Sequence, residues 1–203
     1  MARNDSRPAE MRERILAAAA VEFADRGYAG ASIGLIADAA ATGKGQVQYH
    51  FSAKSDIALD LIRSAFSRAP FANVLDDAPP IHGMEAIVAS IRGVADAFQN
   101  DVRVRAAVRL MREYQLIPAT LPTPYVGWVA RIGLLLREAE AAEEIPAGLD
   151  HDQEAWHLVA YFYGVQEISN RLTERADLPE RIEEMLTRAL KTLGVKHPNR
   201  FTR

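Results

Sequence analysis

Residues 32–54, SIGLIADAAATGKGQVQYHFSAK, constrain the fold more than any other part of this chain of 203 residues. Ser32 is a favourable N-cap, and apolar side chains follow it with the i, i+3, i+4, i+7 spacing of a short helix. The next turn contains Gly43, whose conformational freedom is expected to allow a sharp bend into a second helix. In that helix Val47 and Phe51 are four residues apart and are expected to face inward. The pattern predicts a helix-turn-helix.

The outward face of the second predicted helix carries polar groups that suit double-stranded DNA. Lys44 and Gln48 are four residues apart and lie opposite the apolar pair, with Gln46 near the helix start. Amide and ammonium groups are the donors that reach base edges and phosphates in a major groove. His50 and Lys54 add two candidate phosphate donors. The stretch is therefore predicted to bind duplex DNA.

A longer set of residues has the spacing of a known signature: residues 14–19, Phe23, Gly27, Tyr28, Ser32, Ile33, Ile36, Ala37, Gly45, Tyr49, His50, Phe51 and Lys54. Together they resemble the N-terminal signature of the TetR family of one-component transcriptional regulators, over about the first third of the chain. Together with the outward-facing Lys44, Gln46 and Gln48, the matching residues give a predicted operator-DNA site that comprises Ser32, Lys44, Gly45, Gln46, Gln48, Tyr49, His50 and Lys54. Gln48 departs from the family, which usually has a phosphate-contacting Tyr there, and Ala41 stands at a turn position where the family usually has Gly. The operator sequence therefore does not transfer from relatives.

Apolar residues recur with the period of an α-helix in segments that are separated by Pro, Gly and Asp. This pattern indicates an all-α chain. The first helix is expected over about residues 7–26, with Gly27 at its end, and completes a three-helix DNA-binding domain at residues 1–55. Residues 56–203 are expected to form a helical ligand-binding and dimerisation domain. The helix that starts near Ser55 is expected to be the only covalent route between the two domains and to end at residues 76–80. Further helices are expected at about residues 83–100, 102–116, 124–144, 151–175 and 179–193.

The last two predicted helices bear on the oligomeric state. The final one has a sustained apolar stripe: Leu178, Ile182, Met185, Leu186, Ala189, Leu190 and Leu193. The one before it is apolar on more than one side, at Trp156, Val159, Ala160, Tyr163 and Val165. These stripes either serve a core within the chain or form half of a two-fold four-helix interface. Because a helix-turn-helix protein gains affinity from two half-sites, a homodimer on a pseudo-palindromic operator is predicted.

Segments beyond the first third resemble the γ-butyrolactone-type autoregulator receptors of actinobacteria: residues 124–128, 164–169, 172–173, 175–178 and Arg181. Those receptors are TetR-family repressors that sense diffusible lactone, butenolide or furan signals controlling antibiotic production. The resemblance implies that Trp128 lines the floor of a ligand pocket, although a Trp at a helix start is otherwise a core anchor. Tyr163 stands where such receptors often have Thr, which favours a smaller or more polar ligand. Other candidate ligand contacts are Tyr114, Tyr161, Phe162 and Gln166.

Three alternatives stay open on sequence alone. A pseudo-receptor or an efflux-type regulator of the same fold responds to an antibiotic or another apolar ligand. A helical interaction protein without DNA binding requires the polar face of the second motif helix to be incidental. An enzyme is the least favoured class, because the five His residues lack a metal-binding spacing and the chain has no phosphate loop, nucleophile elbow or Cys. No catalytic residue, metal or cofactor is therefore expected.

Composition adds weaker constraints. The absence of Cys fits a reducing cytoplasm, and no apolar run approaches the ~18 residues of a membrane span. A cytoplasmic protein without membrane contact is expected. The net charge of −3 gives DNA binding little support, so that prediction depends on the motif.

Overall fold

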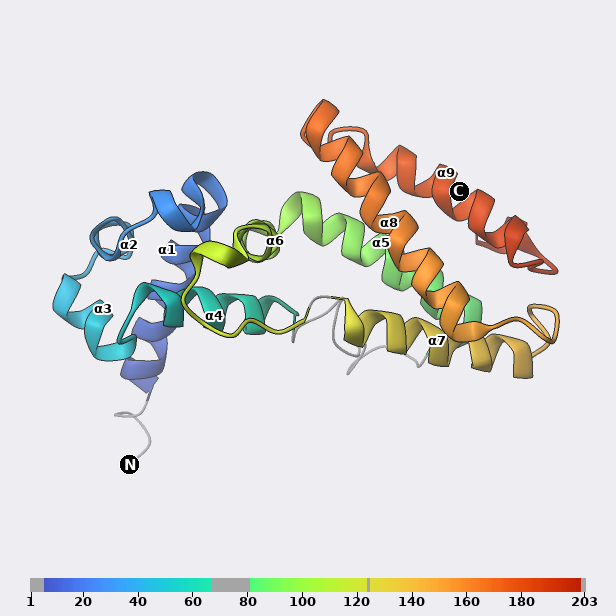
Figure 1. Cartoon of the computed structure of the whole chain (residues 1–203), viewed down its shortest axis with the longest axis horizontal. Helices are drawn as coiled ribbons and strands as arrows, with labels where there is room; N and C mark the ends of the chain where they lie inside the picture. Colours follow the sequence, from blue (N-terminus) through green and yellow to red (C-terminus); the bar gives the residue numbers. More distant parts are fainter. Residues whose placement is uncertain (1–5, 67–80, 124, 202–203) are drawn as a thin grey trace. The chain divides into compact units, whose positions relative to one another are not determined.

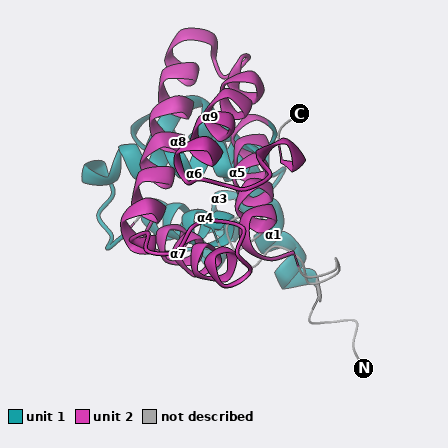
Figure 2. Ribbon diagram, turned by 90° about the vertical axis from the view of Figure 1, so that its right-hand side faces the viewer, with its two compact units in different colours: residues 1–68, 100–122 teal, residues 69–99, 123–203 magenta. Residues whose placement is uncertain are grey.

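The computed structural model describes residues 6–66, 81–123 and 125–201, and the regular elements in these ranges are all helices (Figure 1). The all-α prediction is confirmed. Within the same ranges no helix has the length and apolar character needed to cross a membrane. The chain forms two compact units (Figure 2): Met1–Arg68 with Asn100–Pro122, and Ala69–Gln99 with Thr123–Arg203.

Unit 1 contains the helix-turn-helix and three further helices. Its α-helices are α1 (Ser6–Gly30), α2 (Ile33–Ala39), α3 (Lys44–His50), α4 (Lys54–Phe66) and α6 (Val102–Arg112), followed by a short 3-10 helix, η1 (Tyr114–Leu116). Although α6 comes much later in the chain, it packs mainly against α1 and α4. All five α-helices contribute side chains to one apolar core, among them Ile15, Phe23, Ile36, Val47, Leu61 and Leu110.

The helix starts and ends follow the sequence signals closely. In α1 the backbone kinks at Gly27, where φ is +70°, one residue after the predicted end of the first helix. The helix predicted over residues 102–116 instead breaks after Arg112 and continues as η1. The predicted end of the fourth helix, at residues 76–80, lies outside the described residues.

Unit 2 is built from α5 (Gly83–Asn100), α7 (Val126–Ala141), α8 (His151–Thr173), α9 (Leu178–Thr192) and a 3-10 turn, η2 (Pro198–Arg200). Helix α8 packs against both α7 and α9. Arg92 on α5 donates two 2.6 Å hydrogen bonds to the carboxylate of Glu183 on α9 and a third to the carbonyl of Phe201. These contacts tie α5 to α9 and to the C-terminal turn, and hydrogen bonding to Glu183 raises the pKa of Arg92.

The turn between α8 and α9 is held by one carboxylate. Asp177 accepts hydrogen bonds from the hydroxyls of Ser169 (2.5 Å) and Thr173 (2.6 Å) and from the guanidinium of Arg181 (3.0 Å). These hydrogen bonds, of which that from Ser169 contributes most, lower the pKa of Asp177 to about 2. The turn places Arg175, with φ at +67°, in the interior of unit 2.

The two apolar stripes predicted for a dimer interface differ in burial. The stripe of α9, residues 178–193, is buried within the chain, so the prediction that it forms an interface is wrong: it packs into the core of unit 2. Helix α8 also buries Val159, but it leaves Trp156 60% exposed and Ile168 61% exposed. The free apolar surface of this pair of helices therefore lies on α8.

The division into units bears on two further predictions. The chain passes between the units at residues 68–69, 99–100 and 122–123, so the prediction of a single covalent route is wrong. Helices α4 and α6 lie in the same compact unit as the helix-turn-helix, whereas the predicted boundary at residue 55 places them in the ligand-binding part. As a division by function, that boundary stays a prediction.

Candidate DNA-binding and ligand-binding sites

Ser32 fixes the start of the first motif helix. It is extended, with φ at −136°, and its hydroxyl accepts a 3.2 Å hydrogen bond from the backbone N–H of Leu35, as an N-cap does. Ile36 and Ala37 are buried, so α2 presents the predicted apolar face to the core. The Ser32 hydroxyl is therefore engaged in capping α2.

The bend between the motif helices does not depend on Gly43. Gly43 is extended, with φ at −87°, a conformation open to any residue, whereas Ala41 takes the left-handed conformation with φ at +49°. Arg14 on α1 donates a 2.6 Å hydrogen bond to the carbonyl of Ala40 and so satisfies the C-terminal end of α2. The predicted role of Gly43 is wrong, because this chain places the strained residue two positions earlier.

Helix α3 separates buried from exposed side chains as predicted. Val47 is fully buried and Phe51 is 4% exposed. On the opposite side Tyr49 is 78% exposed, and its ring meets the ring of His50 edge-on at 5.1 Å. His50 is half-buried. The exposed residues of the helix, Lys44, Gly45, Gln46, Gln48 and Tyr49, are called the α3 outer face below.

Lys44 reaches back toward the start of α2. A Cβ atom added at Gly34 would lie 3.0 Å from Cε of Lys44 and 3.6 Å from Oγ of Ser32. Gly34 therefore leaves room for the alkyl stem of Lys44. The ammonium lies at the junction of the two motif helices.

Lys54 differs from the other predicted phosphate donors. Its ammonium donates to the carbonyls of Tyr28 (2.6 Å) and Ala31 (2.8 Å), and it lies 4.2 Å from the centre of the Tyr28 ring. Burial lowers the pKa of Lys54. Two of its three N–H donors thus have partners within the chain, and its role at phosphate stays a prediction.

Arg109 on α6 and Glu113, the C-cap of that helix, hold the same part of α1, and both were missed from the sequence. Glu113 accepts a 2.6 Å hydrogen bond from the backbone N–H of Tyr28, and its carboxylate occupies the space that a side chain at Gly27 would need. Arg109 donates to the carbonyl of Ala24 at 2.9 Å and pairs with Glu113 at 3.2 Å. The i, i+4 spacing of Arg109 and Glu113 is visible in the sequence, but their partners are 85 residues away and no pattern relates them.

In unit 2 the structure brings together part of the predicted ligand set. Trp128 on α7 is 9% exposed, and its indole N–H donates to the hydroxyl of Ser90 on α5 at 3.0 Å. Phe162 on α8 meets the ring of Trp128 edge-to-face at 5.0 Å and that of Phe98 at 5.7 Å. Gln166, one helical turn beyond Phe162, is completely buried. Trp128, Ser90, Phe98, Phe162 and Gln166 are called the α5–α7–α8 cluster below.

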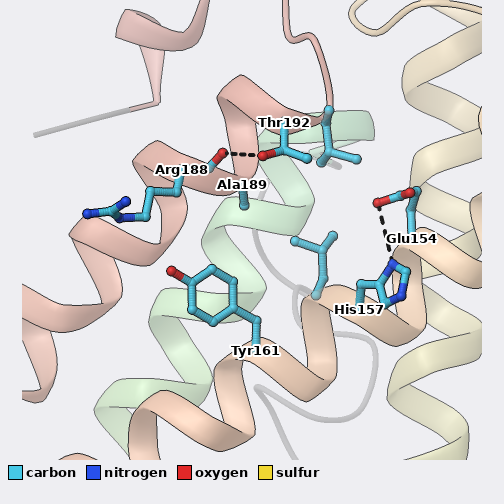
Figure 3. Close-up of a pocket in the computed structure, with 8 residues that line it drawn as sticks. Glu154, His157, Tyr161, Arg188, Ala189 and Thr192 are labelled. Atoms are coloured by element: carbon cyan, nitrogen blue, oxygen red, sulfur yellow. Dashed lines mark hydrogen bonds and ion pairs between the residues drawn. The ribbon is translucent and has the colours of Figure 1, made fainter.

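Three other candidates lie outside this cluster. The ring of Tyr163 is half-buried and meets that of Tyr125 at 5.4 Å. Tyr114 lies in η1, which belongs to unit 1, and is 57% exposed, so its role at a ligand stays a prediction. Tyr161 lines a hollow of about 100 Å³ between α8 and α9, together with His157 and Arg188 (Figure 3). No residue of the α5–α7–α8 cluster lines that hollow.

Comparison with known proteins identifies the fold and its relatives. Residues 15–61 match the family model described as bacterial regulatory proteins, tetR family. The A-factor receptor protein of Streptomyces griseus is 28% identical over 184 residues, which are 91% of this chain and 63% of the relative. This chain therefore spans less than two thirds of that relative's length.

Solved structures match over nearly their whole length. A structure from work on the control of antibiotic production by bacterial hormones is 34% identical, covers 91% of this chain and 97% of its own, and has a TM-score of 0.84. The TetR regulator TylP from Streptomyces fradiae is 30% identical, with 95% and 92% coverage and a TM-score of 0.73. An ArpA-like γ-butyrolactone receptor is 26% identical, with 96% and 94% coverage and a TM-score of 0.77. The matched family consists of regulatory proteins and not of enzymes.

The contacts of Lys54 predict that it acts mainly on stability. Lys54→Met removes two charged hydrogen bonds and should lower the free energy of unfolding by about 1.5–3 kcal/mol, measured by urea denaturation. Lys44→Met is the matched control, because it removes an exposed ammonium and should change stability by less than about 0.5 kcal/mol. If Lys54→Met unfolds at the wild-type urea concentration but binds all DNA sequences more weakly, the main partner of the ammonium is phosphate.

Proposed function

This chain belongs to the TetR family of bacterial transcriptional regulators, and we propose that it is a homodimeric repressor that a small diffusible signal releases from its operator. The observation that carries the proposal is the α3 outer face, on which donor side chains are exposed along a helix anchored by buried Val47 and Phe51. Such a helix presents its donors to a major groove as one rigid body. Because operator DNA lies in the bacterial cytoplasm, the proposed function places the protein there.

On this proposal Gln46 and Gln48 contact bases and Lys44 contacts phosphate. An amide can donate and accept at once, which suits bidentate pairing with adenine, whereas an ammonium only donates and carries a charge. Tyr49 and His50 adjoin these residues and supply further contacts to the phosphate backbone of the DNA. Gly45 has no side chain, and a Cβ atom there would meet no described atom within 4 Å. The main chain of the protein at Gly45 is therefore open to a DNA phosphate. Ser32 contributes by capping α2 and so orienting the pair of helices.

The exposed side of α8 is the proposed dimer surface. Trp156, Ala160, Gly164 and Ile168 follow one another at intervals of four residues along that side. A ridge with this spacing packs against its own symmetry copy at an angle near −50°. Gly164 is at the centre of the ridge, and a Cβ there would meet no described atom within 4 Å, so it allows close approach of a second α8. Exposed apolar surface of this kind marks interaction sites.

The signal is proposed to be of γ-butyrolactone, butenolide or furan type and to bind at the α5–α7–α8 cluster. The cluster has the composition of a small-molecule site, with aromatic walls and few oriented polar groups. The likeness to a γ-butyrolactone receptor and to a structure concerned with hormone control of antibiotic production supports both the ligand class and a role in secondary metabolism. Trp128 offers its ring for stacking, since its N–H is engaged by Ser90.

A covalent path joins the proposed ligand site to the DNA-binding unit. Helix α5 carries Ser90 and Phe98 of the cluster and ends at Asn100. Asp101 caps the next helix, α6, by accepting from the N–H of Arg103 at 2.8 Å. At the far end of α6, Glu113 holds the N–H of Tyr28 at the kink of α1. A ligand that shifts the end of α5 therefore acts on the helix that holds α1.

Replacing the amides of the α3 outer face should alter sequence preference. Gln46→Ala or Gln48→Ala is expected to relax discrimination at one or two base pairs and to cost about 1–3 kcal/mol on the preferred operator, because a bidentate base contact is lost. Binding-site selection from random duplexes with each variant measures this. An unchanged preference at every operator position in both variants contradicts the assignment of the outer face.

The dimer surface is tested by placing a charge on it. Ile168→Asp is expected to sediment as a monomer and to lose operator binding, because a carboxylate cannot be buried unpaired at a helix crossing. Leu134→Asp, at a similarly exposed apolar residue of α7, is the matched control and should remain dimeric. A dimeric Ile168→Asp protein at micromolar concentration places the interface elsewhere.

Ligand and operator should oppose each other reciprocally. A synthetic γ-butyrolactone should bind about 5–150-fold more weakly to the operator-bound protein than to the free protein, because coupling free energies of about 1–3 kcal/mol are typical. Calorimetric titration with and without the operator measures the factor. Equal affinities contradict the proposed release, and binding of an antibiotic in place of every lactone, butenolide and furan probe identifies a pseudo-receptor.

A further inference from the structure

The buried amide of Gln166 has a hydrogen-bond partner at its oxygen but none at its nitrogen among the described residues. The side chain is 0% exposed, and its Oε1 lies 3.4 Å from Nη2 of Arg175. Its Nε2 is also buried and has no hydrogen-bond partner among the described residues. Buried amide N–H groups in folded proteins are nearly always paired. This donor is therefore available to an acceptor from outside the chain.

Arg175 fixes which way the amide points. A guanidinium only donates hydrogen bonds, so the amide atom that faces it must be the oxygen, and the NH₂ group must face away. Arg175 is itself held in place: its backbone carbonyl accepts from Gln99 at 2.6 Å, and its guanidinium lies 5.5 Å from the centre of the Phe98 ring. The amide thus presents a donor in one orientation.

The donor adjoins the aromatic residues of the α5–α7–α8 cluster. Phe162 precedes Gln166 by one helical turn on the buried side of α8 and contacts both Trp128 and Phe98. Phe98 in turn contacts Arg175, so the five side chains form a continuous set. One oriented donor beside three aromatic rings matches an apolar ligand with a single acceptor.

We propose that Gln166 determines ligand specificity by donating from Nε2 to a carbonyl oxygen, with Arg175 as the positioning residue that holds the amide. The inference rests on the proposed ligand response and narrows the chemical class of the ligand. The signal must carry a carbonyl acceptor, as a lactone or butenolide ring does or as a furan does only through a carbonyl substituent. A cyclic ether of the same size and chain length lacks the required acceptor strength.

The experiment compares two probes that differ in that carbonyl alone: an alkyl γ-butyrolactone and the tetrahydrofuran with the same alkyl chain. Isothermal titration of the full-length dimer should show wild type binding the lactone about tenfold more tightly, the value of one net hydrogen bond. Gln166→Glu keeps an acceptor toward Arg175 but replaces the donor with a carboxylate oxygen. Its preference for the lactone should fall to about one or below.

Two further variants separate specificity from folding. Gln153→Glu makes the same chemical change at an exposed residue of α8 and should keep the wild-type preference. Arg175→Met frees the amide to rotate, so the lactone preference should fall while affinity for the ether is retained. Urea denaturation of Gln166→Glu should show an intact fold, because the carboxylate pairs with Arg175.

The failures of the two proposals are distinguishable. A folded Gln166→Glu protein with the wild-type lactone preference overturns the role of Gln166 and leaves the ligand class standing. Wild type that binds the lactone no better than the ether also overturns the inference. Wild type that binds neither probe overturns the proposed ligand class, and the role of Gln166 with it.

Discussion

The carboxylate of Glu113 and the ammonium of Lys54 hold residues 27–31 between them, and the placement of the helix-turn-helix depends on these contacts. Glu113 accepts from the N–H of Tyr28, while Lys54 donates to the carbonyls of Tyr28 and Ala31. The kink at Gly27 interrupts the helical hydrogen bonds of α1, and unpaired backbone groups in a packed region are costly. Both charged groups therefore compensate for the kink. Ser32 follows at once, so the direction of α2 and α3 is set at this junction.

The regular features of the fold could be predicted from the sequence because their causes are local. Ser32 caps the helix that follows it, and Val47 is buried because its four-residue spacing from Phe51 gives α3 one apolar side. The start of α5 at Gly83 and of α8 at His151 follows from the turn residues before them. The exposed polar side of α3 is the complement of its buried side.

The features that sequence reasoning missed depend on partners far along the chain. Lys54 resembles a surface phosphate donor until α1 is seen to place two carbonyls beside it, and Glu113 resembles a solvated residue until Gly27 is seen to leave room for it. The stripe of α9 is a similar case. Periodicity shows that residues such as Ile182 and Leu186 are buried, but it does not show whether the covering surface is in the same chain.

The scarcity of cations on the α3 outer face fits the proposed regulation by a small ligand. Lys44 is the only ammonium on that face, and the ammonium of Lys54 is already engaged at the α1 kink. Each phosphate contact adds affinity for any sequence through counterion release, so few such contacts mean weak non-specific binding. In the proposed function, operator affinity then rests on base contacts and on the second half-site of a dimer. A ligand supplies only about 1–3 kcal/mol of coupling free energy. Coupling of this size changes the occupancy of the operator decisively only where the operator complex is not far more stable than the other states of the protein. In the proposed repressor, an α3 outer face whose base contacts come from two amides, doubled by dimerisation, keeps operator binding within the range that such a ligand can reverse.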